Sequence, residues 1–264
     1  MDNRLPNLPA DISRDHPAFR CRGYGTSPFM RGKVLFYVVR ISDTCGRWDN
    51  TARGNFSAYV RKWLGWLDRM SADHPYPVRT SSCAVDVILD KPFAFFSEAQ
   101  YSRICETLFN VTSVKEMNEI LCKKHNVNAV TVVFAFNYNI RGHARNANKL
   151  NPRVYEDEIA FVSARDCDRA VLLHEVFHLF GAVDYYYPVQ YKDACLKYFQ
   201  KSVMYDDAPE VDPLTAYLIG WTDRLSPMAV LFLKATANVT YKQICDARSK
   251  EWKKSNNRAY NGDK

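Results

Sequence analysis

The chain has 264 residues, of which 47% are hydrophobic and 25% are charged, a composition that excludes a disordered or fibrous protein. A chain of this length can bury a substantial core as one globular unit. The basic residues behind its formal charge of +7 are spread along the sequence, no nucleic-acid-binding module accompanies them, and no apolar run approaches the ~20 residues of a membrane span.

The first half of the chain predicts alternating strands and helices. The predicted strands are residues 33–41, 84–89, 129–136 and 159–163, which are rich in β-branched and aromatic residues. The predicted helices are residues 56–70, 98–109 and 114–124. This order favours an α/β fold built on a twisted, mostly parallel sheet.

Residues 141–157 are rich in Arg, Asn and Gly, and we expect them to contain a loop and an edge strand of the sheet. An extended peptide can add to such an edge through its backbone. His143 lies in this segment. A solvated loop histidine is the simpler interpretation of His143, and an extra metal ligand is the alternative.

A His-Glu-x-x-His pattern, made by His174, Glu175 and His178, lies inside an apolar segment. On an α-helix the two imidazoles share one face about 6 Å apart along the axis, so both can bind one cation, and Glu175 stays beside a metal-bound water. A helix that is apolar nearly all round is buried, where these side chains need a partner such as zinc. A core helix whose histidines bond to backbone carbonyls is the alternative.

Gly181 and Asp184 extend the pattern. A third ligand six residues beyond His178 reaches the same ion only if the backbone turns sharply, which glycine permits. The sequence therefore predicts a Zn²⁺ site of His174, His178 and Asp184, with Glu175 as the general base of a hydrolase.

This extended pattern resembles the zinc signature of the metzincin metallopeptidases, with Asp184 where most of the clan has histidine and where the snapalysin-like proteases have aspartate. Ser202-Val203-Met204-Tyr205 resembles the Met-turn of that clan, which implies that Met204 lies beneath the metal. The resemblance covers roughly residues 158–221. It implies a zinc-dependent endopeptidase with an upper lobe of twisted mixed sheet and helices, an active-site helix, and a smaller irregular or helical lower lobe.

The expected parts are an N-terminal extension at 1–30, a single metalloprotease catalytic domain at 31–255 with an upper lobe at about 31–180 and a lower lobe at about 181–255, and a polar tail at 256–264. In the lower lobe, Asp212 and Pro213 predict the start of a helix over 212–221. A last helix is predicted at about 241–253. We expect a monomer that binds protein or peptide substrates extended along the sheet edge.

Some roles stay open at this point. Tyr205, or a tyrosine of the run Tyr185-Tyr186-Tyr187, could supply a phenol that stabilises an oxyanion, and aromatic walls are the alternative. Two other classes remain, a non-catalytic binding protein on a protease fold and a zinc hydrolase of another clan whose third ligand is a later acid. Asp193 and Asp223 are the candidates for that acid.

Eight cysteines and three Asn-x-Ser/Thr sequons favour a secreted, disulfide-bonded glycoprotein. Cys167 and Cys195 form one candidate disulfide, and Cys21 is a candidate for a thiolate that blocks the zinc or for an ordinary disulfide. Residues 1–20 are polar and lack the apolar segment of a signal peptide. We therefore expect that a leader, and an inhibitory propeptide, have been removed; a leaderless cytosolic effector is the alternative.

Overall fold

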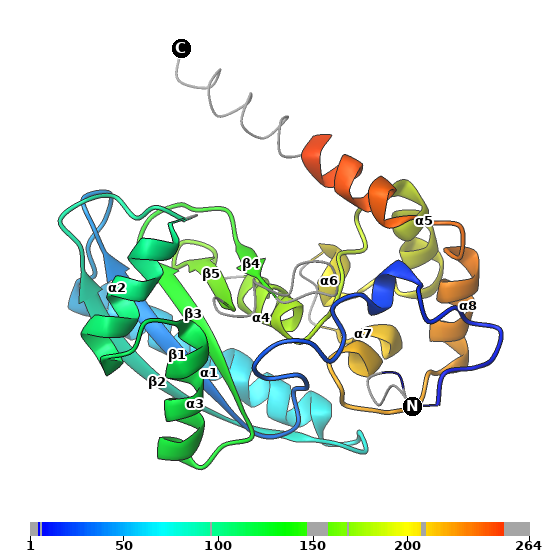
Figure 1. Ribbon diagram of the computed structural model, residues 1–264, viewed down its shortest axis with the longest axis horizontal. Helices are drawn as coiled ribbons and strands as arrows, with labels where there is room; N and C mark the ends of the chain where they lie inside the picture. The colour runs from blue at the N-terminus through cyan, green and yellow to red at the C-terminus, as the bar shows by residue number, and fades with distance from the viewer. Residues whose placement is uncertain are drawn as a thin grey trace.

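A five-stranded sheet stands beside a smaller group of helices in the computed structural model, which describes residue 5 and residues 7–95, 97–146, 158–167, 169–206 and 210–250 (Figure 1). The strands are β1 (Gly32–Ser42), β2 (Val78–Ile88), β3 (Ala129–Phe136), β4 (His143–Arg145) and β5 (Ile159–Ser163), in the order β2-β1-β3-β5-β4. All neighbours in the sheet are parallel except β4, which runs antiparallel to β5. The α/β class predicted from the sequence is confirmed.

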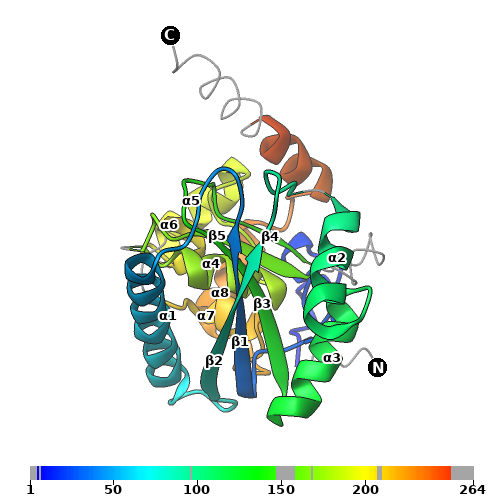
Figure 2. The ribbon, with the colours of Figure 1, turned by 90° about the vertical axis from the view of Figure 1, so that its left-hand side faces the viewer.

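Helices cover both faces of the sheet because successive side chains of its strands point to opposite sides. Val34, Phe36 and Val38 of β1 join the core beneath α1 (Asn50–Ser71). Leu35 and Tyr37 join a second core with residues of α2 (Glu98–Phe109) and α3 (Val114–His125). Figure 2 shows α1 on one face of the sheet and α2 and α3 on the other.

Two upper-lobe elements are longer than predicted. The helix expected from residue 56 begins at Asn50, because the Asp49 side chain caps it by accepting from the Ala52 backbone N–H at 2.7 Å. The strand expected at 84–89 begins at Val78. Most residues of β2 are only partly buried or exposed, as expected of the outermost strand, so its first half lacks an apolar pattern.

The lower lobe is helical. It contains α5 (Val189–Tyr198), α6 (Val203–Asp206), α7 (Pro213–Leu218) and α8 (Pro227–Ala235), and residues 241–250 are also helical. Asp212 caps α7 by accepting from the backbone N–H groups of Leu214 and Thr215, as the Asp-Pro pair predicts. The sequence did not predict α5 and α8. The rest of the last predicted helix and the polar tail lie outside the described residues.

The N-terminal segment, expected as an extension, packs into the lower lobe as part of its core. His16 stacks on Tyr191 with ring centroids 6.3 Å apart, and Phe19 meets Tyr217 edge to face at 6.1 Å. The Met30 backbone N–H donates to the Ile219 carbonyl at 2.8 Å. The lower lobe is therefore built from both ends of the chain, as the dark blue and orange segments of Figure 1 show.

Candidate metal centre

Both histidines of the pattern come from α4 (Val171–Leu179), which lies between the sheet and the lower lobe. Its apolar residues, among them Leu172, Val176 and Phe177, are fully buried in the main hydrophobic core. The helix carries His174 and His178 into this interior, where the two residues are 4% and 7% exposed. The prediction of a buried helix is confirmed.

Gly181 ends α4 and redirects the chain. Its N–H donates to the His178 carbonyl, and the Ala182 N–H donates to the Phe177 carbonyl, the two hydrogen bonds of a Schellman motif. Gly181 has φ +95°, and a Cβ there would lie 2.8 Å from the Arg22 backbone. Glycine is needed both for the left-handed turn and for the close approach of the N-terminal segment.

The turn brings Asp184 back to the two imidazoles. Its Oδ1 lies 3.2 Å from His174 Nε2 and 3.1 Å from His178 Nε2, and the two Nε2 atoms are 3.2 Å apart. All three residues are buried. Among the described residues, this is the one group of three or more His, Cys, Asp or Glu side chains that could hold a metal ion.

The other ring nitrogens fix the tautomers of both histidines. His174 Nδ1 lies 2.8 Å from the Val203 carbonyl, and His178 Nδ1 lies 2.9 Å from the Ala182 carbonyl. Because a carbonyl can only accept, each Nδ1 carries the hydrogen. Each Nε2 therefore faces Asp184 and is the nitrogen available to a metal ion, which is the arrangement that metal-binding histidines have in proteins.

The charges of the group also suit a cation. Burial alone would lower the pKa of His174, but Asp184 and the nearby Glu175 carboxylate oppose it and raise this pKa to about 9. Burial would raise the pKa of Asp184, yet His178 and His174 hold it well below its ordinary value. A proton thus takes the place between nitrogen and oxygen that a metal ion would occupy, so the buried group could bind a metal.

Glu175 lies beside this group but outside it. The residue is 6% exposed, and its charge acts on His174. Gly142, which precedes the edge strand β4, approaches Glu175 so closely that a Cβ on it would lie 2.9 Å from Oε1. The edge strand therefore begins directly beside the predicted base.

The segment resembling a Met-turn adjoins the site through its backbone. The Val203 carbonyl receives the His174 hydrogen bond, and the Met204 carbonyl accepts from the Tyr185 N–H at 3.0 Å. Met204 itself is fully buried. The Ser202 hydroxyl anchors the start of this segment by donating a hydrogen bond to Asp212 at 2.6 Å.

The four tyrosines that the sequence left open have different surroundings. Tyr186 stacks on the His174 ring at 6.0 Å, and the Tyr187 hydroxyl donates to Asp184 Oδ2 at 2.9 Å. Tyr185 is buried in the lower lobe against Asp212, and Tyr205 packs against the main core. Sequence spacing could not separate them, because neighbouring residues of an irregular turn point in unrelated directions.

Arg248 is a residue of the site that sequence reasoning missed. It lies in the helical residues 241–250, and its guanidinium donates to Asp184 Oδ2 at 3.0 Å. The sequence showed only a small concentration of basic residues near the C-terminus. Nothing in that pattern marks one arginine as a partner of a ligand 64 residues earlier.

The other candidate ligands have different partners or positions. Asp223 pairs with Arg31 at 2.5 Å, and Asp193 is exposed on α5. His143 is a residue of β4, where it stacks on Phe161 at 4.4 Å, so it is not the solvated loop histidine that the sequence favoured. Burial raises the pKa of Cys21 to about 11, which keeps its thiol protonated at neutral pH.

The cysteine side chains of the described residues form no disulfide. The Cys167 and Cys195 thiols, the candidate pair, instead donate to the carbonyls of Ala164 and Phe199.

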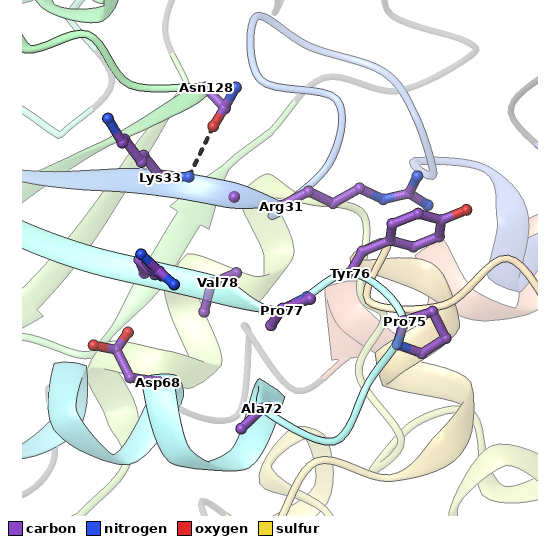
Figure 3. A pocket seen from close by; sticks show the side chains of 11 residues that line it. Arg31, Lys33, Asp68, Ala72, Pro75, Tyr76, Pro77, Val78 and Asn128 are labelled. Carbon is purple, nitrogen blue, oxygen red and sulfur yellow. Dashed lines mark hydrogen bonds between the residues drawn. The ribbon is translucent and has the colours of Figure 1, made fainter.

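An open hollow of about 750 Å³ lies away from α4, at the amino ends of β1 and β2 (Figure 3). One of its basic side chains, Arg31, bonds to the Gly220 carbonyl and to Asp223, and the Arg31 guanidinium lies 4.0 Å from the centroid of the Tyr76 ring. Arg31 therefore joins the two lobes, and we assign no chemistry to this hollow.

The sequence matches no protein-family model, and no curated protein is similar to it. The site is therefore interpreted from its own residues.

Proposed function

We propose that this chain is a zinc-dependent endopeptidase that resembles the metzincins. The observation that carries the proposal is the triangle of His174 Nε2, His178 Nε2 and Asp184 Oδ1, with edges of 3.1–3.2 Å and a buried glutamate beside it. Donors about 2.0–2.1 Å from a tetrahedral zinc ion lie roughly 3.3 Å apart, so the triangle has the right size for zinc. Three protein ligands leave one position open, as in catalytic rather than structural zinc sites.

A bound zinc ion would supply positive charge that polarises a carbonyl oxygen and acidifies a water molecule. Glu175 follows His174 directly on α4, so its carboxylate is beside the ligands without belonging to them. We assign it the role of base: Glu175 accepts a proton from the water that attacks the peptide carbonyl and transfers it to the leaving amine. We assign Asp184 the role of third ligand, which fixes the geometry of the metal centre.

Tyr186 is the preferred candidate for a phenol that hydrogen-bonds to the developing oxyanion. Its ring stacks on His174, and burial, with the Asp184 and Glu175 carboxylates nearby, raises its pKa far above the ordinary value. Its hydroxyl therefore stays protonated and able to donate. Tyr205, the other candidate, remains an expectation from the resemblance.

The edge strand suggests how the substrate binds. Among the strands that the structure describes, β4 lies at the edge of the sheet and pairs with β5 alone. A peptide that adds to its other side lies next to Gly142 and therefore close to Glu175. Recognition through the backbone favours extended protein segments over one particular sequence.

A secreted location is part of the proposal. The asparagines of all three sequons, Asn55, Asn110 and Asn238, are exposed and accessible to glycosylation. A mass decrease of the protein from its natural source after glycosidase treatment supports this location, and an unmodified mass contradicts it. No helix in the described part of the chain has both the length and the apolar character needed to cross a membrane.

Metal analysis combined with cleavage of an unstructured protein tests the enzyme proposal. We expect about one zinc per chain, cleavage that stops when a chelator is added, and recovery when zinc is returned. Absence of bound zinc would contradict the metal centre. Zinc binding without cleavage of any unfolded protein in a panel would instead favour a non-catalytic binding protein.

A further inference from the structure

The two oxygens of Asp184 have separate partners. Oδ1 faces both imidazoles, whereas Oδ2 accepts from the Tyr187 hydroxyl at 2.9 Å and from Arg248 Nη2 at 3.0 Å. Arg248 Nε also donates to the Tyr187 oxygen at 2.9 Å. The three side chains thus form a closed ring of hydrogen bonds on the side of Asp184 away from the histidines.

The helical residues 241–250 bring Arg248 to this position. Tyr241 and Arg248 are seven residues apart, about two helical turns, and therefore lie on the same face of that helix. The Arg20 guanidinium carbon lies over the Tyr241 ring, 3.0 Å from the ring centroid. This face of the helix is therefore directed at the N-terminal segment as well as at Asp184. Figure 1 shows this helix on the lower-lobe side of α4.

This ion pair differs from an ordinary surface pair. Exposed pairs stabilise proteins only slightly, because water solvates both partners. The Asp184 side chain is only 4% exposed, although that of Arg248 is 56% exposed. A buried carboxylate that loses one of its donors can rotate, and the rotation moves the oxygen that faces the histidines.

We propose that Arg248 is a positioning residue of the metal centre: with Tyr187, it holds Asp184 so that only Oδ1 is presented to the ion. The C-terminal helix is then a component of the site and not a peripheral appendage. The inference rests on the proposed metal binding. Side chains that hydrogen-bond to metal ligands typically change metal affinity 10–100-fold when removed.

The test measures zinc affinity by competition with a chromophoric chelator, for the full chain and for Arg248→Met, Arg248→Lys and Tyr187→Phe. Lys250→Met is the matched control, since it removes the same charge from an exposed position on the same helix. The absorption spectrum of the Co²⁺-loaded protein reports the coordination geometry. Thermal unfolding of the metal-free variants verifies that they fold.

We expect Arg248→Met to weaken zinc binding about 10–100-fold and to alter the cobalt spectrum. Arg248→Lys, which keeps the charge but not the two-pronged contact, should restore part of the affinity, and Tyr187→Phe should weaken binding less than Arg248→Met. Lys250→Met should stay within about twofold of the unmodified chain.

Equal or tighter zinc binding by Arg248→Met, with an unchanged cobalt spectrum, overturns the inference and leaves the proposed function standing. An unmodified chain that takes up neither zinc nor cobalt overturns both. If Arg248→Met does not fold, the Lys and Phe variants decide in its place: unchanged affinity in both contradicts the role of Arg248.

Discussion

Gly142 and Glu175 are so close that a larger residue at position 142 would force a side chain of α4 to move. A Cβ built on Gly142 would lie 2.9 Å from Glu175 Oε1 and 2.7 Å from Val171 Cγ1. The residue that precedes β4 therefore sets the position of the proposed base. This contact couples the edge strand to the proposed base.

Gly142→Ala is expected to lower peptide cleavage on the order of a hundredfold while zinc stays bound, because the new methyl group displaces the Glu175 carboxylate. Steady-state kinetics and metal analysis on the same preparation measure the two effects. Gly54→Ala, in α1, is the control, since a Cβ there meets nothing within 4 Å. Full activity of Gly142→Ala would show that the position of Glu175 does not matter.

Glu175→Gln is expected to retain zinc and to reduce cleavage by about 10²–10⁴-fold, because glutamine has a similar shape but cannot accept the proton. The comparison requires zinc-loaded protein of both forms and an unfolded protein substrate. Glu106→Gln, an exposed change on α2, is the control. Undiminished turnover by Glu175→Gln would reject the role as base.

Asp184→Asn is expected to weaken zinc binding by more than roughly 100-fold, the upper range for changes to residues that merely support a ligand. The amide removes the negative charge that both histidine nitrogens face. Asp193→Asn, at the exposed acid that sequence alone could not dismiss, should leave affinity unchanged. Competition with a chelator measures the zinc affinity of both variants. Weaker binding by Asp193→Asn and unchanged binding by Asp184→Asn would identify Asp193 as the third ligand.

Asp212→Ala is expected to destabilise the fold by about 3 kcal/mol, since it removes the cap of α7 and leaves buried hydroxyls without their acceptor. Asp212 accepts from the Ser202 and Thr215 hydroxyls, both at 2.6 Å. Ser226→Ala, which removes only the cap of α8, should reduce stability by about 1 kcal/mol. Urea unfolding of the metal-free variants measures the free energy of unfolding of each. Equal losses in the two variants would contradict the role of Asp212 as the shared acceptor of several buried hydrogen bonds.

His16 should make stability depend on pH. Burial lowers its pKa to about 4. Nδ1 accepts a hydrogen bond from the Ala18 N–H, so this nitrogen does not carry a proton. The unfolded chain, with a pKa near 6.5, takes up the proton first. The contribution of His16 is therefore complete above about pH 6.5 and is lost as pH falls toward 4, by up to about 3 kcal/mol.

His16→Gln should abolish that part of the slope, because glutamine does not titrate. Urea unfolding of the unmodified chain and the variant between pH 4 and pH 7 measures the difference. Parallel stability curves would show that His16 is not buried as a neutral side chain.

Local patterns were enough to predict several elements. The strand at 129–136 and the helix at 98–109 have the predicted bounds, because each combines a continuous apolar pattern with distinct ends. Gly181 is another such case: the sharp turn expected from it is a Schellman motif at φ +95°. Where apolar pattern and capping residue coincide, neighbouring residues determine the structure.

Elements that depend on distant contacts could not be predicted in this way. The exposed edge strand β2 has no apolar pattern in its first half, and α5 and α8 are stabilised by packing on each other and on the N-terminal segment. The described residues of the expected extension at 1–30 instead contribute to the lower-lobe core, since Phe19 and Met30 are buried there. Sequence order does not reveal such pairings.

The sequence by itself determined that two imidazoles share a helix face with a glutamate between them, because the period of an α-helix follows from backbone geometry alone. Only the tertiary structure decided which acid completes the group and what holds it. Asp184 and Tyr187 belong to the turn after α4, and they meet Arg248 because the helical residues 241–250 fold back onto that turn. Spacing along one helix is a local property, whereas the partners of a buried carboxylate depend on how the whole chain packs.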